Sequence, residues 1–171
     1  DIAEFLTRPE KSLYGVGVVT GIQADPVTMG IENLIWAFGG DLGDYKTHKV
    51  KGILDSKESI AGLEFYKKLY KLSPPDYQDI FFDIPQEDFM KGRLAMFFSY
   101  FAFFPDLEDG TKNPYKEGTG YFKMPKGPKA QVASLGGQGL SVSSYSSKKD
   151  EAFAFLKWII RDDVQDKWAE L

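Results

Sequence analysis

The residues able to do chemistry in this sequence are few. It contains no cysteine and one histidine, His48, within the lysine-rich stretch KTHKVK. A catalytic base needs an orienting partner, and no carboxylate neighbours His48, so a solvated loop residue is the favoured interpretation. The sequence contains no metalloprotease, nucleophile-elbow or Walker A spacing, and Asp106, Glu108 and Asp109 lack the length of a calcium loop. A glycosidase-type pair of distant carboxylates stays open, because 25 acidic residues are available.

Aromatic side chains are the first informative feature, since Phe, Trp and Tyr make up 15% of the chain. Most of them must form core. An aromatic ring that lines a polar pocket can instead stack on the C–H face of a sugar. Tyr100 follows Ser99 where a predicted strand gives way to a helix, and both interpretations stay open for it. The cluster around it comprises Phe97, Phe98, Phe101, Phe103 and Phe104.

A glycine-rich stretch, LGGQGL at residues 135–140, is the second informative feature. Gly136 and Gly137 let a ligand approach the main chain closely, and the Gln138 amide can both donate to and accept from a hydroxyl. A simple bend entering a strand explains the same residues equally well. The stretch is therefore a candidate binding loop and a candidate turn.

The elements that must position these residues alternate between strands and helices along the chain. We predict strands over residues 14–20, 93–98, 119–124 and 139–143. Asp25 and Pro26 begin a helix that Gly39 ends, and Asp55 with Glu58 has capping-box spacing before a helix that ends ahead of Ser73. Further helices are expected at residues 87–91, from Tyr100, and from Ser147 to beyond residue 160. This order predicts an α/β fold with a mixed sheet flanked by helices.

Composition narrows the function classes. With 171 residues the chain can bury one core, and its formal charge of −4 disfavours nucleic-acid binding. No apolar run reaches the length of a membrane span. The chain begins at Asp1 without a secretion signal and stops within an amphipathic pattern, so we expect a segment of a longer protein.

Six segments together resemble the bacterial extracellular solute-binding proteins of ABC importers, the maltose-binding-protein-like family. In chain order they are WAFGG at 36–40, AGLEFY at 61–66, FMKGRLAM at 89–96, MPKGP at 124–128, the glycines before GLSVS at 139–143, and DEAFAFLKW at 150–158. The resemblance implies one lobe of a type II periplasmic-binding-protein fold. Residues 1–138 would be the second lobe, and residues 139–171 a strand and helix that cross toward the first.

The resemblance also implies a function without catalysis. The family captures a sugar or polyol outside the cytoplasmic membrane and delivers it to permease subunits, and it uses no cofactor or metal. The protein would be periplasmic or extracellular, lipid-anchored or free. Gln138 stands where polyol binders often have Trp, which favours hydrogen bonding over stacking. The ligand-binding positions implied are Asp25, Thr28, Trp36, Tyr100, Gly136, Gly137 and Gln138.

Two other functions remain open on the sequence. One is a non-catalytic carbohydrate-interaction domain of another surface protein, and the other is a glycosidase domain. Trp36 lies off the apolar stripe of its helix, so it either packs on a neighbouring loop or lines the cleft. The apolar residues Phe155, Leu156, Ile159 and Ile160 lead us to expect a dimer, or a last helix folded back on its own lobe.

Overall fold

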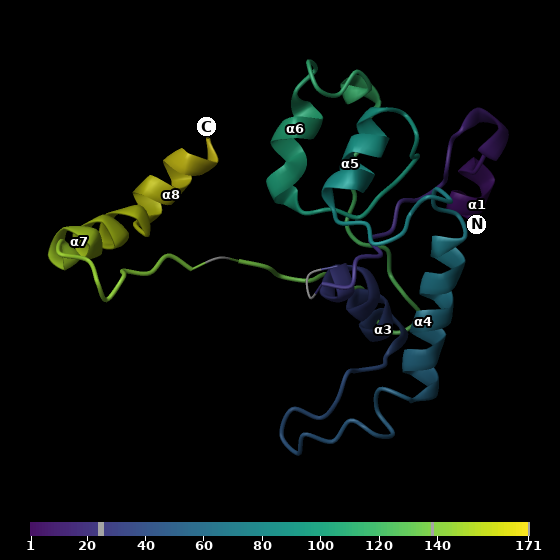
Figure 1. Ribbon diagram of the computed structural model, residues 1–171, viewed down its shortest axis with the longest axis horizontal. Coiled ribbons are helices and arrows are strands. Elements are labelled where there is room, and N and C mark those ends of the chain that lie inside the picture. Colours follow the sequence, from purple (N-terminus) through teal and green to yellow (C-terminus); the bar gives the residue numbers. More distant parts are fainter. Residues whose placement is uncertain (24–25, 138, 171) are drawn as a thin grey trace. The chain divides into compact units, whose positions relative to one another are not determined.

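The computed structural model describes residues 1–23, 26–137 and 139–170. The chain divides into two compact units, Asp1–Ser134 and Leu135–Leu171. Helices dominate the first unit (Figure 1). Its described helices are α1 (Ile2–Leu6), η1 (Pro9–Lys11), η2 (Val27–Glu32), α3 (Asn33–Phe38), α4 (Lys57–Tyr70), α5 (Asp83–Met90), η3 (Phe101–Phe103), α6 (Phe104–Glu108) and η4 (Lys116–Gly118).

The core of this unit forms around the valine-rich segment predicted as the first strand. Val16 and Val18 are 2% and 3% exposed, and Ala3 of α1 packs with them. Partly buried side chains from α4, from the turn that follows it and from residues 96–98 cover the same cluster: Tyr66, Leu69, Leu72, Met96 and Phe98. The Tyr66 hydroxyl also donates to the Val19 carbonyl oxygen at 2.5 Å. The apolar residues of the segment thus bring α1, α4 and residues 96–98 together.

The mixed sheet predicted from the sequence is not formed by the described residues. Residues 14–20 and 93–98 do lie parallel, through isolated bridges from Tyr14 to Leu94 and from Gly17 to Phe97. Both bridges share one register, but the alternation of hydrogen bonds is broken between them, because Tyr14 and Gly17, three residues apart, both donate to residues 93–96. Residues 119–124 and 139–143 are irregular and add no strand. A lone pair of strands is marginal, so pairing stops at two bridges.

The helix predicted after Pro26 is present as two consecutive elements, the π-helical η2 and then α3. It ends as expected at Gly39, whose φ of 90° is a left-handed value that glycine adopts without strain. Helix α3 packs against α4 (Figure 1), and a Cβ on Gly62 would lie 2.9 Å from the Ile35 Cα. Only glycine allows the two backbones to approach so closely.

Helix α4 ends before Ser73 as predicted, but the predicted capping box is wrong. Ser56 is the N-cap, and its side chain accepts from the Ser59 backbone N–H at 3.2 Å. The Asp55 carboxylate instead accepts from the Gly52 N–H in the preceding turn. A serine oxygen one residue later satisfies the same free helical N–H groups, which spacing alone does not reveal.

Residues 127–134, here called the strap, run back along η2 and α3. The backbone N–H groups of Lys129 and Ala130 donate to the Ala37 carbonyl at 3.1 and 3.2 Å. At the other end the Ser134 hydroxyl lies 3.1 Å from Asn33 Oδ1 and 3.4 Å from the Thr28 carbonyl oxygen. The strap is therefore fixed to both ends of this helical stretch.

The second unit contains α7 (Lys149–Ile159) and α8 (Asp162–Ala169) after an irregular stretch. The helix predicted from Ser147 to beyond residue 160 is present as these two helices, and Lys148, not Ser147, precedes the first helical residue. Ala152, Leu156 and Ile159 are half-buried, while Phe153 and Trp158 are 51% and 49% exposed. The predicted domain boundary after residue 138 falls inside this unit, and the role of residues 139–171 as a crossover remains a prediction.

Candidate functional site

Tyr100 is held by aromatic neighbours at the end of the segment 93–98. Its ring meets Phe82 edge-on, with centroids 5.4 Å apart and planes at 79°, and lies 6.3 Å from the Phe103 ring. Phe82 is buried and its neighbour Phe81 is 38% exposed, with their ring centroids 4.1 Å apart. Tyr100 itself is half-buried. The arrangement fixes the ring while leaving part of it open to solvent, as stacking on a ligand requires.

Thr28 and Trp36 lie on the helical stretch formed by η2 and α3. Thr28 is half-buried, and its carbonyl oxygen accepts the Ser134 hydroxyl of the strap. The Trp36 indole N–H donates to Asp41 Oδ1 at 3.2 Å, in the loop that follows Gly39. That carboxylate also accepts from the Leu42 N–H, so the loop and the indole hold each other.

The remaining predicted binding residues are in different positions. Gly136 and Gly137 belong to the second unit and are exposed, and a Cβ at Gly137 would meet no atom within 4 Å. Asp25 and Gln138 lie outside the described residues. The first unit therefore supplies Thr28, Trp36 and Tyr100, and the second supplies the glycines.

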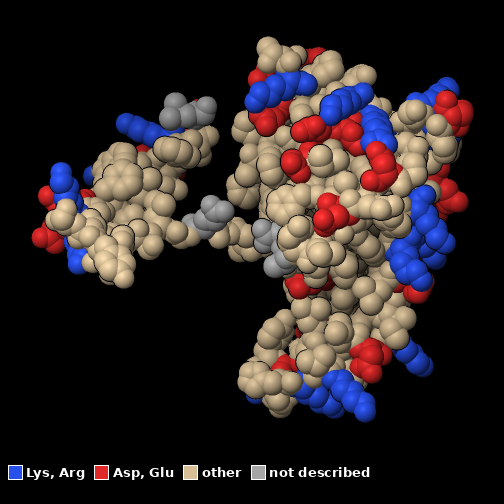
Figure 2. Space-filling view, in the orientation of Figure 1, with Lys and Arg blue, Asp and Glu red and all other residues tan. Residues whose placement is uncertain are grey.

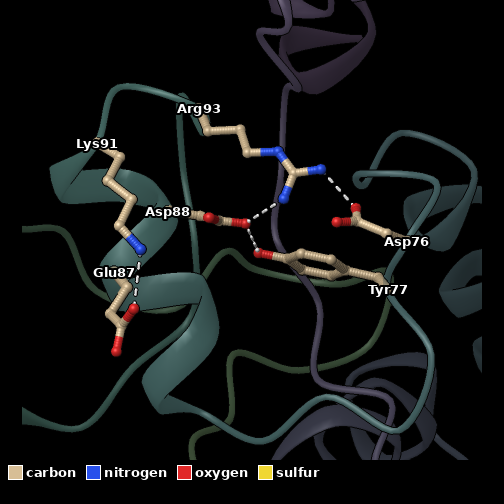
Figure 3. Close-up of polar contacts among 6 residues, drawn as sticks. All are labelled: Asp76, Tyr77, Glu87, Asp88, Lys91 and Arg93. Carbon is tan, nitrogen blue, oxygen red and sulfur yellow. Dashed lines mark hydrogen bonds and ion pairs between the residues drawn. The ribbon is translucent and has the colours of Figure 1, made fainter.

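The most developed polar cluster is one that the sequence analysis missed (Figure 3). The Arg93 guanidinium forms ion pairs with Asp88 of α5, at 3.0 Å, and with Asp76. The Tyr77 hydroxyl donates to the same Asp88 carboxylate at 3.1 Å, and Tyr77 is 1% exposed. The Arg93 guanidinium also lies over the Tyr14 ring, 5.8 Å from its centroid. We call Asp76, Tyr77, Asp88 and Arg93 the Arg93 cluster.

Electrostatics within the Arg93 cluster follow from burial and pairing. The hydrogen bond from Arg93 lowers the pKa of Asp76 below its ordinary value of 3.8. Burial, followed by the negative charge of Asp88, raises the pKa of Tyr77. The cluster joins α5 and the α4–α5 connection to the start of the segment that leads to Tyr100. The hydrogen-bonded pairs within it are 5 to 17 residues apart and follow no motif, so spacing gave no signal.

The residues considered for catalysis and metal binding lie in loops and turns, where the acidic ones form hydrogen bonds and ion pairs with nearby residues. His48 is exposed with a φ of 56° in a loop where Asp44 accepts from the backbone of Lys46 and Thr47. Asp106 pairs with Lys112, and Asp109 accepts from Thr111. Within residues 1–23, 26–137 and 139–170, no three His, Asp or Glu side chains are grouped to hold a metal.

Basic and acidic side chains alternate over the first unit on the face shown in Figure 2. None of the described helices has both the length and the apolar character needed to cross a membrane.

Solved structures of transport proteins share this fold. A solute-binding protein of an ABC transporter from Agrobacterium radiobacter K84, crystallised with ribitol, superposes with a TM-score of 0.81 at 24% identity. A second, from Thermotoga lettingae TMO and bound to alpha-D-tagatose, gives 0.76 at 26% identity. Each comparison covers 99% of this chain but only 42% and 43% of the other chain. The sequence spans less than half the length of these structures.

The sequence comparison agrees with the structural one. The family described as bacterial extracellular solute-binding protein matches residues 1–166, which is nearly the whole sequence. The six segments noted above lie within this range. This chain belongs to the bacterial extracellular solute-binding protein family.

Proposed function

We propose that this chain is part of the substrate-binding component of an ABC importer, and that the whole protein captures a sugar or polyol. The match to the solute-binding family over residues 1–166 carries the proposal. The two similar structures, with ribitol in one and tagatose in the other, support the ligand class. Family membership supports a binding role without catalysis, delivery to permease subunits, and a location outside the cytoplasmic membrane, with or without a lipid anchor.

The proposed lobe comprises residues 1–138, with residues 139–171 crossing toward a first lobe. The match covers only 42% of the ribitol-bound protein. This share supports one lobe together with part of the chain that connects it to the other lobe. The parallel bridges between residues 14–17 and 94–97 would belong to a mixed sheet in the complete protein. A dimer of the chain as it stands would cover the exposed Phe153 and Trp158 of α7.

Each proposed ligand contact has a distinct physical role. Tyr100 would stack its exposed edge and face against the sugar C–H groups, because Phe82 and Phe103 already hold its ring. Gly136, Gly137 and Gln138 would supply amide groups to the hydroxyls. Asp25 and Thr28, at the start of the first long helical stretch, would add polar contacts. Trp36 would form part of the cleft wall while keeping its bond to Asp41.

The test is titration calorimetry of the whole protein with ribitol, tagatose and a series of other sugars and polyols. Tyr100→Ala should weaken binding by about 1–3 kcal/mol, the range for a lost aromatic stack and its buried area. Tyr100→Phe should retain most of the affinity, and Tyr45→Ala, at an exposed residue of another loop, serves as the control. Unchanged affinity for Tyr100→Ala would remove Tyr100 from the site.

The isolated chain provides a second readout. A ligand held between two lobes loses many contacts when one is missing, so the chain alone should bind more weakly than the whole protein. Equal affinity would favour a self-contained carbohydrate-interaction domain. Hydrolysis of a glycoside that requires two acidic residues would favour the glycosidase alternative.

A further inference from the structure

Residues 44–52, here called the lysine loop, lie in the connection from α3 to α4 and project away from both helices (Figure 1). Every residue of the loop is exposed. The loop closes on itself, because Asp44 N–H donates to the Lys49 carbonyl and His48 N–H donates to the Asp44 carbonyl, each at 2.8 Å. Its shape is therefore fixed by its own backbone hydrogen bonds and not by burial.

The acidic side chains of this connection are turned toward nearby N–H groups. Asp44 Oδ1 accepts from the backbone N–H groups of Lys46 and Thr47 at 2.9 and 2.8 Å. Asp41 and Asp55 likewise accept from N–H groups close to them in sequence. These carboxylates thus satisfy the backbone and do not form ion pairs with the lysines of the loop in the described structure.

The lysines of the loop have no carboxylate of their own. Lys46, Lys49 and Lys51 form no ion pair with a described residue, although other lysines of the unit do, as Lys91 does with Glu87. Basic side chains gather at the lower end of the first unit in Figure 2, where Figure 1 places the loop. Three ammonium groups on a fixed, projecting loop can therefore meet an anionic partner.

Aromatic and apolar side chains accompany these charges. Tyr45 is 72% exposed, Val50 is 50% exposed, and Leu54, just beyond the loop, is 39% exposed. Tyrosine is enriched at membrane interfaces, because its ring enters the headgroup layer while its hydroxyl stays hydrated. Lysine is a point charge on an apolar stem, whereas arginine suits bidentate recognition of one carboxylate or phosphate, and the loop contains no arginine. This composition fits a surface of many anionic groups.

We propose that the lysine loop docks the whole protein on an anionic phospholipid surface. Screening limits the reach of a charge to about 8 Å at physiological salt, so the charge of the projecting loop decides the encounter more than the formal charge of −4 of the chain. The proposed location, outside the cytoplasmic membrane and beside permease subunits within it, brings such a surface near. The proposal depends on that location and not on the identity of the solute.

Vesicle flotation tests the docking, with the whole protein purified without a lipid anchor and without sugar. Vesicles that contain phosphatidylglycerol should bind the protein, vesicles of phosphatidylcholine alone should not, and high salt should release it. One lysine at an anionic surface contributes about fivefold to binding, so the triple variant Lys46→Gln, Lys49→Gln, Lys51→Gln should bind about a hundredfold more weakly. Equal binding to both vesicle types, or binding to neither, would overturn the proposal.

A second group of three lysines provides the matched control. Lys123, Lys126 and Lys129 are also exposed, but Lys129 lies in the strap with its side chain against Gly39. Their joint replacement by glutamine should retain most of the vesicle binding. An equal loss from both triple variants would reveal a general effect of charge and would overturn the assignment to the lysine loop. Both variants change exposed residues and should keep the native midpoint in urea.

Two further measurements separate this proposal from others. Tyr45→Ala should weaken vesicle binding while leaving the sugar affinity of the whole protein unchanged, so failure of the docking and failure of the solute proposal are distinguishable. Immobilised polyglutamate serves as the probe for an acidic protein partner. Retention on polyglutamate that requires the three loop lysines, without binding to vesicles, would assign the loop to a protein surface and overturn the proposal.

Discussion

Replacing Arg93 by methionine should be among the most destabilising single changes outside the apolar core. The substitution keeps a long apolar side chain but removes the cation that pairs with Asp76 and Asp88. The Asp88 side chain is only 9% exposed, so its charge would remain in place with the Tyr77 hydroxyl as its donor. A buried charge left without its partner is costly.

The magnitude follows from the exposure of each pair. Breaking a buried ion pair costs about 3–5 kcal/mol of folding stability. The Arg93 side chain is 29% exposed, so we expect the loss of its pair with Asp88 to cost an amount near or below the lower end of that range. Asp76 is 63% exposed, and such a pair contributes roughly 0.2–1 kcal/mol. The contact of Arg93 with the Tyr14 ring adds about 0.5–1 kcal/mol. We expect a total loss of about 3 kcal/mol.

Urea unfolding followed by circular dichroism measures this loss as a shift in midpoint at constant slope. Asp76→Asn is the matched control and should cost no more than about 1 kcal/mol, because it affects only the exposed pair. In a double-mutant cycle, Asp88→Asn should cost less in the Arg93→Met background than in the native protein. Additive costs, or a loss for Arg93→Met no larger than that for Asp76→Asn, would refute the assignment of the energy to Asp88.

The same cluster predicts a dependence on pH. Arg93 lowers the pKa of Asp76 in the folded protein, so this pair stabilises the fold above the unfolded-state pKa of about 3.8. The stabilisation is lost as the pH falls through the lower, folded-state pKa. The stability difference between Asp76→Asn and the native protein should therefore shrink in that acidic window, and a constant difference would contradict the pKa assignment.

Further substitutions test the packing described above. Gly62→Ala should destabilise by about 1–3 kcal/mol despite the better helix propensity of alanine, because the new methyl group would press on Ile35, whereas Gly118→Ala has open space and should cost little in the same thermal unfolding assay. Ser56→Ala should cost about 0.5–2 kcal/mol in urea unfolding through loss of the α4 cap, with Ser144→Ala in the second unit as a comparison for an exposed serine. Tyr66→Phe should cost about 0.5–1.5 kcal/mol, and a wild-type midpoint for this variant would show that the bond to Val19 contributes nothing.

Helices were predicted well because their information is local. The stripe of α4, the stop at Gly39 and the helices α7 and α8 follow from residue type and spacing over one or two turns. Boundaries were less accurate where two candidates compete, as Asp55 and Ser56 do for the α4 cap. Helix α5 begins at Asp83, four residues before the predicted start at residue 87, since Pro85 is accepted in its first turn.

Strands and the polar cluster depended on partners that are distant in sequence. Residues 14–20 and 93–98 have similar apolar patterns and do pair, whereas residues 119–124 have a comparable pattern but form no bridge with another described segment. The Arg93 cluster forms only because a turn brings Asp76 and Tyr77 beside α5. Sequence spacing contains no record of that turn.

The strap at residues 127–134 determines how the first unit would respond to a pulling force. A load applied at residue 135 acts first on the contacts of the Ser134 hydroxyl and only afterwards on the two backbone hydrogen bonds to the Ala37 carbonyl. Bonds loaded one after another break at lower force than bonds loaded together. The strap would therefore detach from α3 at a lower force than the one that unfolds the core around Val16 and Val18.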